Sequence, residues 1–244
     1  MGLDWCLEPP IKLGLGEKAQ DLLSRIEGLE NQINTDYRYF KSKEENKEKS
    51  SLNYLFEDNA RLLQAFRKEK EQEFKTLNSL KGEYRSCFVQ PYEVLKSPIV
   101  GQDEKADNYI KSQYKEIYLL GNDGVKPKMT EEEFLDACRG EPIYHLSENQ
   151  EGIALVSGMM VNPTSFRGKV LNYISFLSET LKEEAYIRHS PDQLKDYGQR
   201  LLIVHDTWEG PGTEENNESL KLLKAAATWA IFWGSQGFGM NPWY

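Results

Sequence analysis

Three histidines are the residues of this chain best suited to acid–base or metal chemistry near neutral pH. They are His145, His189 and His205. No two of them have the spacing of metal ligands that share one helix face, and the sequence contains no H-E-x-x-H motif and no cluster of cysteines and histidines. We therefore predict neither a metal site nor a cofactor.

His205 and Asp206 form the one adjacent pair that could transfer protons, because they follow the apolar run LLIV. At the end of a strand, such a pair could act as general base and acid. However, Tyr197, Leu201, His205 and Trp208 recur with a helical period, which places His205 on the buried face of a helix. We prefer a core histidine, and we keep a catalytic site around His205 and Asp206, beside Tyr197 and Trp208, as the alternative.

Three other short motifs could suggest ligand sites. In TEEEF, three adjacent carboxylates fan around the first turn of a helix, and Thr130 with Glu133 matches a capping box. GNDG lacks the later glutamate of a calcium loop. GSQGFG follows a helix, whereas phosphate cradles lie between a strand and the start of the next helix. Without a catalytic motif, a protein that is not an enzyme is favoured.

Composition and charge restrict the class of protein further. The 244 residues are 39% hydrophobic and 28% charged, as expected for a folded globular chain. The net charge of −9 argues against nucleic-acid binding, which needs a basic surface. The three cysteines are far apart, and the N-terminus lacks the pattern of a signal or transit peptide. We therefore expect a cytoplasmic protein.

The first part of the chain predicts a long helical hairpin. After an extended arm with two consecutive prolines, a helix begins near Glu17 and runs beyond twenty residues. A second helical series extends from Leu52 to Leu80, and the charged stretch 41–51 forms the tip between them. The first helix carries an apolar stripe with three- and four-residue spacing, which is typical of a coiled coil but also of an ordinary bundle. The predicted interaction residues of this stripe are Leu22, Ile26, Leu29 and Ile33.

The remainder of the chain predicts a second domain. Prolines and glycines in residues 81–101 mark a boundary, so we expect domains at 1–80 and 81–244. The second domain contains several helices, among them one over 162–186, and a small β-hairpin near 143–156. The predicted fold class is therefore mainly α, with a long N-terminal helical hairpin on a C-terminal helical domain with a small β-hairpin.

The last twenty residues, from Ala225, carry no charge and include three tryptophans. Their continuous apolar run spans about nine residues, against the ~20 that a membrane span needs, so we predict no membrane span. Apolar residues all round the helix predict burial in a core. The final GFGMNPWY then folds over the protein's own surface or docks on a partner, and the predicted contact residues there are Phe238, Trp243 and Tyr244.

The N-terminal MGLDWC offers two interpretations. Gly2 matches the start of a myristoylation motif, but Cys6 stands where that motif has Ser or Thr, so we prefer packing of Trp5 against the domain. MGLDWC, with SFRGKVLNYI and DYGQRLL, also resembles uncharacterised proteins of large DNA viruses and some protists. This resemblance implies a viral or virion-associated role.

Together these features predict a non-enzymatic structural or interaction protein that acts within a larger, viral assembly through helix–helix contacts. Its expected partner is another protein or a second copy of itself, with no nucleic acid. Its expected location is the cytoplasm or a virion.

Overall fold

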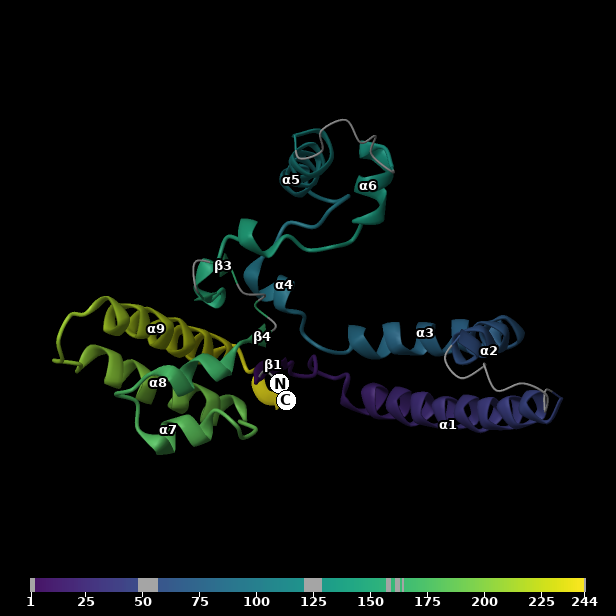
Figure 1. The fold of residues 1–244 in the computed structure, drawn as a ribbon, viewed down its shortest axis with the longest axis horizontal. Helices are drawn as coiled ribbons and strands as arrows, with labels where there is room; N and C mark the ends of the chain where they lie inside the picture. The colour runs from purple at the N-terminus through teal and green to yellow at the C-terminus, as the bar shows by residue number, and fades with distance from the viewer. Residues whose placement is uncertain are drawn as a thin grey trace. The chain divides into compact units, whose positions relative to one another are not determined.

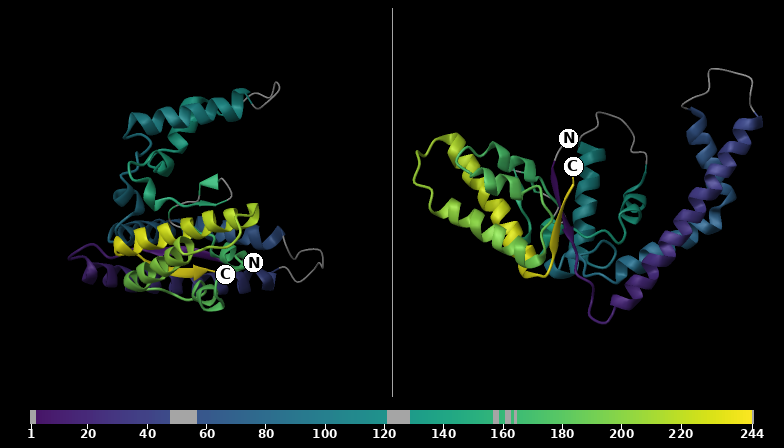
Figure 2. Two further views of the ribbon diagram at one scale, coloured as in Figure 1. Left: turned by 90° about the vertical axis from the view of Figure 1, so that its left-hand side faces the viewer. Right: turned by 90° about the horizontal axis from the view of Figure 1, so that it is seen from below.

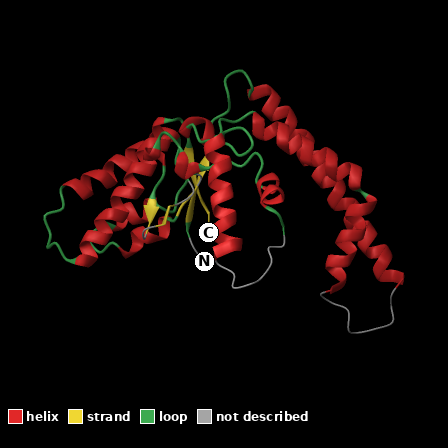
Figure 3. Ribbon diagram, turned by 90° about the horizontal axis from the view of Figure 1, so that it is seen from above, coloured by secondary structure: helices red, strands yellow, loops and turns green. Residues whose placement is uncertain are grey.

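A computed structural model describes residues 3–47, 57–120, 129–156, 159–160, 163 and 165–243 (Figure 1). Helices make up most of these residues and strands are few, so the predicted mainly α fold class is confirmed (Figure 3). The chain divides into two compact units. The hairpin unit is Ile11–Val89, and the C-terminal unit combines Met1–Pro10 with Gln90–Tyr244.

This division differs from the predicted boundary at residue 80. The N-terminal arm belongs to the C-terminal unit, because residues 4–8 form a strand of that unit's sheet. The hairpin unit also continues to Val89, since the backbone N–H of Lys12 donates to the carbonyl oxygen of Cys87 at 2.8 Å. This bond and the β-bridge between Ile11 and Phe88 close the base of the hairpin.

Three helices build the hairpin unit: α1 (Gly16–Lys47), α2 (Glu57–Glu69) and α3 (Glu71–Ser86). The predicted long helix from near Glu17 is confirmed. Two ion pairs show that α1 runs antiparallel to the other two: Lys81 Nζ lies 2.5 Å from Glu30 Oε1, and Lys70 Nζ lies 2.8 Å from Asp36 Oδ2. Of the predicted charged tip, residues 41–47 continue α1 and the rest lies outside the described residues.

The apolar stripe of α1 is buried inside this hairpin. Leu22, Ile26 and Ile33 pack with Phe66 of α2 and with Leu77, Leu80 and Cys87 at the α3 end, and Leu29 packs partly buried against them. The stripe therefore serves as the internal contact of a helix bundle, the second of the two uses that its spacing allowed.

The C-terminal unit is built around a three-stranded antiparallel sheet in the order β4 (Ser165–Phe166), β1 (Asp4–Glu8), β5 (Gly239–Trp243). Strands β1 and β5 come from opposite ends of the sequence and run side by side (Figure 2). Trp5 pairs with Phe166 on one side and with Pro242 on the other. Residues 239–243 of the predicted tail thus pair with the protein's own N-terminal strand.

The predicted β-hairpin near 143–156 is displaced along the chain. Residues Tyr144–Leu146 form a 3-10 turn (η2), and the short antiparallel pair joins β2 (Leu155–Val156) to β3 (Met159–Met160). Backbone bonds from Leu146 to Ile143 and from Ser147 to Tyr144 make the turn, and the Gln150 side-chain amide donates to the carbonyl oxygens of His145 at 3.2 Å and Ser147 at 2.6 Å. These local bonds replace the ladder that the apolar pattern predicted.

The remaining helices of this unit are mostly short. The predicted cap Thr130 is confirmed, and Ser190 and Thr213 cap their helices in the same way: each accepts a hydrogen bond from the third residue of its helix. In chain order the helices are α4 (Pro91–Leu95), α5 (Glu104–Tyr114), the π-helical η1 (Lys115–Leu120), α6 (Glu131–Ala137), η3 (Gln150–Gly152), η4 (Gly168–Tyr173), α7 (Glu179–Glu184), α8 (Pro191–Asp206) and α9 (Glu214–Ser235).

The predicted continuous helix over 162–186 is wrong. This segment contains β4, η4 and α7 instead. Gly168 lies directly against the Trp5 indole, where a β-carbon would come within 2.3 Å of Nε1, so the chain must bend around that ring. Ser178 then caps a new helix, its hydroxyl accepting from the backbone N–H of Leu181.

The core of this unit gathers around α9. Trp229, Trp233 and Trp5 are fully buried, which confirms both the predicted burial of the last helix and the predicted packing of Trp5. Helices α8 and α9 pack antiparallel at close range, with Gly198 and Gly234 at their contact points. A small residue at each point lets the two backbones approach.

Candidate functional site

His205 and Asp206 lie in the last turn of α8, where His205 Nδ1 is 2.7 Å from Asp206 Oδ1. The His205 side chain is 22% exposed and the Asp206 side chain 62%, so His205 lies at the edge of the core and Asp206 faces solvent. The pair is near the C-terminal end of α8, and not at the end of a strand as the catalytic alternative required.

The two aromatic residues of that alternative site have other partners. Trp208 stacks on Phe176 with ring centroids 4.0 Å apart. Tyr197 is on the buried face of α8, two turns before His205, and its hydroxyl donates to the carbonyl oxygen of Leu181 at 2.7 Å. These four residues therefore make separate contacts and do not gather around one reaction centre.

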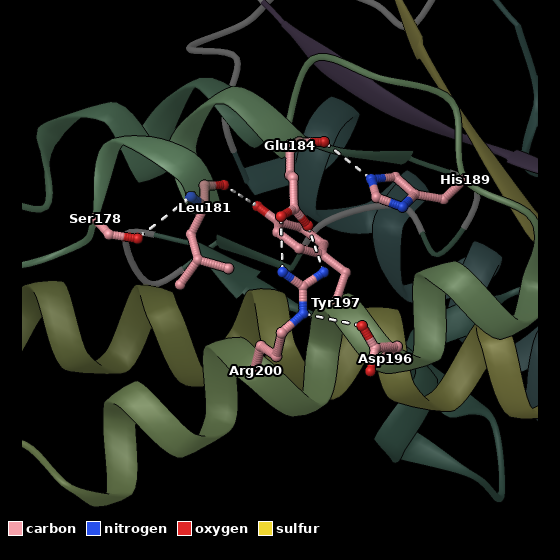
Figure 4. A network of polar contacts seen from close by, with 7 residues as sticks. All are labelled: Ser178, Leu181, Glu184, His189, Asp196, Tyr197 and Arg200. Carbon is pink, nitrogen blue, oxygen red and sulfur yellow. Dashed lines mark hydrogen bonds and ion pairs between the residues drawn. The ribbon is translucent and has the colours of Figure 1, made fainter.

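The densest polar network of the C-terminal unit surrounds Glu184 and Arg200 (Figure 4). Arg200 donates to both carboxylate oxygens of Glu184, with Nη1 2.7 Å from Oε1, and its Nε lies 2.9 Å from Asp196 Oδ2. The hydrogen bond from Arg200 holds the pKa of the Glu184 carboxyl below its ordinary value, and the same bond raises the pKa of Arg200. Both groups are therefore charged at neutral pH.

Three side chains of this region bind carbonyl oxygens at the C-terminal end of α7. Tyr197 donates to Leu181, and His189 Nε2 lies 2.9 Å from the carbonyl oxygen of Glu184 (Figure 4). Trp5 Nε1 donates to the carbonyl oxygen of Ala185 at 2.9 Å. Because the last carbonyls of a helix have no partner within it, these three bonds stabilise the end of α7.

This network is a structural clamp. A carbonyl oxygen can only accept, so His189 must carry its proton on Nε2. Burial raises the pKa of the Tyr197 phenol far above its ordinary value, which keeps it protonated as a donor. His189 is 3% exposed and stacks on Tyr197. The phenol of Tyr197 and the imidazole of His189 are therefore engaged in holding α7 against α8.

The hairpin unit contains a cavity of about 350 Å³ between α1 and the junction of α2 with α3. Helix α2 ends at Glu69 and α3 begins at Glu71, with Lys70 between them in a non-helical conformation. The cavity lies where this bend faces α1. The lining residues are Asp36, Tyr39, Phe40, Lys43, Phe66, Glu69 and Lys70.

Aromatic and charged side chains line different parts of this cavity. Phe66 is 1% exposed and packs against Phe40 with ring centroids 5.5 Å apart, whereas Tyr39 is 71% exposed. Lys70 Nζ bonds to Asp36 at 2.8 Å and to Glu73 at 3.3 Å, and these hydrogen bonds raise the pKa of Lys70. The accessible lining of the cavity is thus mainly polar, with Phe66 buried beneath it.

Sequence reasoning missed this cavity. Its residues come from two stretches more than twenty positions apart, and only the antiparallel register of the hairpin brings them together. The run YRYF in α1 and Phe66 of α2 were the available signal, but neither indicates by itself which residues the fold brings together.

The interaction residues predicted from the sequence occupy different environments. Leu22, Ile26, Leu29 and Ile33 belong to the hairpin core described above. Phe238 is fully buried and meets Trp233 edge to face at 4.8 Å. Trp243 on β5 is 69% exposed, and Tyr244 lies outside the described residues.

No known protein family, curated protein or solved structure matches this chain. Within the described ranges, no three side chains of His, Cys, Asp or Glu gather in a way that could hold a metal ion. In the same part of the chain, none of the helices combines the length and the hydropathy of a membrane span.

Proposed function

We propose that this chain is a non-enzymatic interaction protein that works within a larger assembly and binds its protein partner through the helical hairpin. The observation that carries this proposal is a hairpin that forms a compact unit of its own and has a cavity lined mainly by polar side chains. The resemblance of MGLDWC to proteins of large DNA viruses supports a viral assembly as the setting, in the cytoplasm or in a virion.

The hairpin offers a long outer surface to a partner. Its α1 helix of 32 residues is about 48 Å long at 1.5 Å per residue. Since its apolar stripe packs inside the hairpin, contacts with another protein would come from the outer faces and the cavity. Helix–helix contact through these outer faces replaces the contact through Leu22, Ile26, Leu29 and Ile33 that the sequence suggested.

Charge is distributed unevenly between the two units, and this favours the hairpin as the binding part. The hairpin unit carries 15 Lys and Arg against 14 Asp and Glu, whereas the rest of the chain carries 15 against 25. The negative charge of the protein thus belongs to the C-terminal unit. A nearly neutral hairpin with mixed charges can approach partners of either sign without strong repulsion.

An enzyme with a site at His205 and Asp206 is the second candidate, and the 2.7 Å contact between the two side chains is the observation that favours it. A carboxylate in this position can orient an imidazole as a base. Against it, Asp206 is largely exposed, so water competes for both groups, and Tyr197 is committed to the clamp. We therefore place the interaction protein first.

Lysine-directed crosslinking of complexes isolated from the native source tests the proposal. Exposed lysines of the hairpin, such as Lys18, Lys43 and Lys75, should crosslink to a second protein or to a second copy of the chain. Exposed lysines of the C-terminal unit, such as Lys105 and Lys195, serve as the internal comparison. Crosslinks confined to the C-terminal unit, or a monomer that a metal ion or nucleotide stabilises, would contradict the proposal.

A further inference from the structure

We propose that the C-terminal unit contains a hinged lobe, built on α5 and α6, which moves as one body relative to the sheet and to helices α8 and α9. The lobe with its stem comprises the described residues 97–120 and 129–150. Three observations carry the inference: a separate apolar core, a stem of two chain segments and a strained residue at the joint. All of these residues lie outside the hairpin, so the inference does not depend on the proposed function.

The lobe has an apolar core of its own. The buried members of this core are Val100, Ala106, Ile110 and Ile143, and its partly buried members are Tyr109, Phe134, Leu135 and Cys138. The rings of Tyr114, Tyr118 and Phe134 extend it, with centroids 5.1, 5.8 and 5.9 Å apart. Because these contacts close within the lobe, α5 and α6 can keep their packing when the lobe changes its orientation.

Two chain segments, 97–100 and 140–147, form the stem of the lobe. The backbone N–H of Ile143 donates to the carbonyl oxygen of Pro98 at 2.9 Å. Closer to the main core, the buried hydroxyls of Ser97 and Ser147 share a hydrogen bond of 2.6 Å. The two segments are thus fastened to each other, so a movement of the lobe carries both of them together.

Both segments leave the main core at one point. Leu95 is fully buried, and a β-carbon at Gly152 would stand 2.7 Å from Leu95 Cδ2 and 2.6 Å from Phe232 Cε1 of α9. Trp233 Nε1 also donates to the carbonyl oxygen of Gly152 at 3.1 Å. These contacts fix Leu95 and Gly152 on α9. The joint therefore lies directly beyond them, at Lys96 on one segment and Glu151 on the other.

The backbone of the joint is strained at Lys96. This residue is the C-cap of α4 and has a φ of 50°, in the left-handed region that favours glycine. In the described part of the chain, no other residue except glycine has a positive φ. Backbone strain of this kind is concentrated at functional and switching segments, because a strained conformation has nearby alternatives of similar free energy.

The side chains at the joint offer little resistance to a swing. Lys96 and Glu151 are both exposed. Lys96 Nζ lies 3.4 Å from Glu148 Oε2, but these two side chains are 73% and 71% exposed, so water screens the pair and it contributes little to stability. Relative motion is the normal behaviour of two parts of a chain that are joined without a large apolar interface.

Residual dipolar couplings of the backbone amides in the full chain test the inference. The couplings of α8 and α9 define the alignment of the main core, and those of α5 and α6 define the alignment of the lobe. The lobe should fit one alignment tensor of its own, with a smaller magnitude than the tensor of the main core. A single tensor that fits all four helices would overturn the inference. Couplings of α5 and α6 that fit no common tensor would also overturn it, because the lobe would then not move as one body.

Lys96→Gly tests the position of the joint. Glycine adopts the left-handed and several other conformations without steric cost, so the swing should widen and the alignment of the lobe should decrease further relative to that of the main core. Thr207→Gly is the matched control, since Thr207 is the C-cap of α8 and the substitution also introduces a glycine after a helix. It should leave the ratio of the two alignments unchanged. An unchanged ratio in Lys96→Gly, or an equal change in both variants, would overturn the assignment of the hinge to Lys96.

Discussion

Gly198 in α8 lies directly against the backbone of Ile231 in α9, so close that a β-carbon at position 198 would stand 2.8 Å from the Ile231 nitrogen. The same β-carbon would lie 2.9 Å from the carbonyl oxygen of Ala227. These are fixed backbone atoms, so the two helices cannot accept a larger residue here without moving apart.

Gly198→Ala is therefore expected to lower the free energy of unfolding of the C-terminal unit by about 1–3 kcal/mol, because overpacking outweighs the gain in helix propensity. All five tryptophans belong to this unit, so the midpoint of urea unfolding followed by tryptophan fluorescence measures it selectively. Gly28→Ala in α1 is the control, because nothing lies within 4 Å of a β-carbon there. It should not lower that midpoint, and a stable Gly198→Ala would contradict the close packing.

Trp5→Ala is expected to destabilise the C-terminal unit by about 3–5 kcal/mol, although Trp5 lies near the start of the chain. Its indole is fully buried against Phe166, Tyr197 and Trp229 and donates to Ala185. Near-ultraviolet circular dichroism with thermal unfolding measures the loss. Trp243→Ala on the neighbouring β5 removes an exposed ring and should change stability by no more than about 0.5 kcal/mol.

Tyr197→Phe should cost about 1–3 kcal/mol, because it leaves the buried carbonyl oxygen of Leu181 without its donor. The ring and its stacking with His189 remain, so the loss comes from the hydrogen bond alone. Chemical denaturation measures the effect, with Tyr173→Phe at an exposed position as the control. Equal stability of the two variants would show that the clamp does not need this bond.

The ion pair of Glu184 with Arg200 makes stability depend on pH in the acid range. The pKa of Glu184 is lowered from 4.5 in the folded protein, so the unfolded chain takes up this proton first as the pH falls. The pair therefore stabilises the fold above about pH 4.5, and this contribution is lost as the pH falls through the folded-state pKa.

Arg200→Ala should flatten that dependence. Because Arg200 is 39% exposed and screened by water, we expect a loss at neutral pH of only about 0.5–1 kcal/mol. Urea unfolding at a series of acid pH values measures both quantities, and Glu184→Gln should flatten the curve in the same way. An unchanged acid slope in both variants would mean that other carboxyl groups control it.

Local sequence signals predicted the long first helix, the helix that Thr130 caps and the buried last helix correctly. Thr130, Ser190 and Thr213 each begin a helix, because a capping side chain and the residues after it act within one turn. The predictions failed where contacts with residues distant in the sequence change the local structure. The segment around Gly168 has a helical apolar pattern, but the Trp5 ring, more than 160 positions away, requires it to bend.

The hairpin cavity shows the same difference between what local patterns predict and what distant residues decide. The spacing of Leu22 and Ile26 predicted an apolar helix face that must be buried. It did not indicate which residues bury that face, because a partner protein and the rest of the hairpin could both do so. The tertiary structure placed α2 and α3 there. By the same pairing it brought Tyr39 next to Phe66 and Glu69 and so formed the cavity.

Sequence alone determined that this protein is mainly helical, that a long helix begins near Glu17 and that the last helix is buried, because caps and apolar periodicity act over a few residues. Only the tertiary structure decided that the N-terminal strand pairs with the C-terminal one, that Tyr197 and His189 hold α7, and that the hairpin contains a cavity. Each of these depends on the register between segments distant in the chain, which local patterns do not encode.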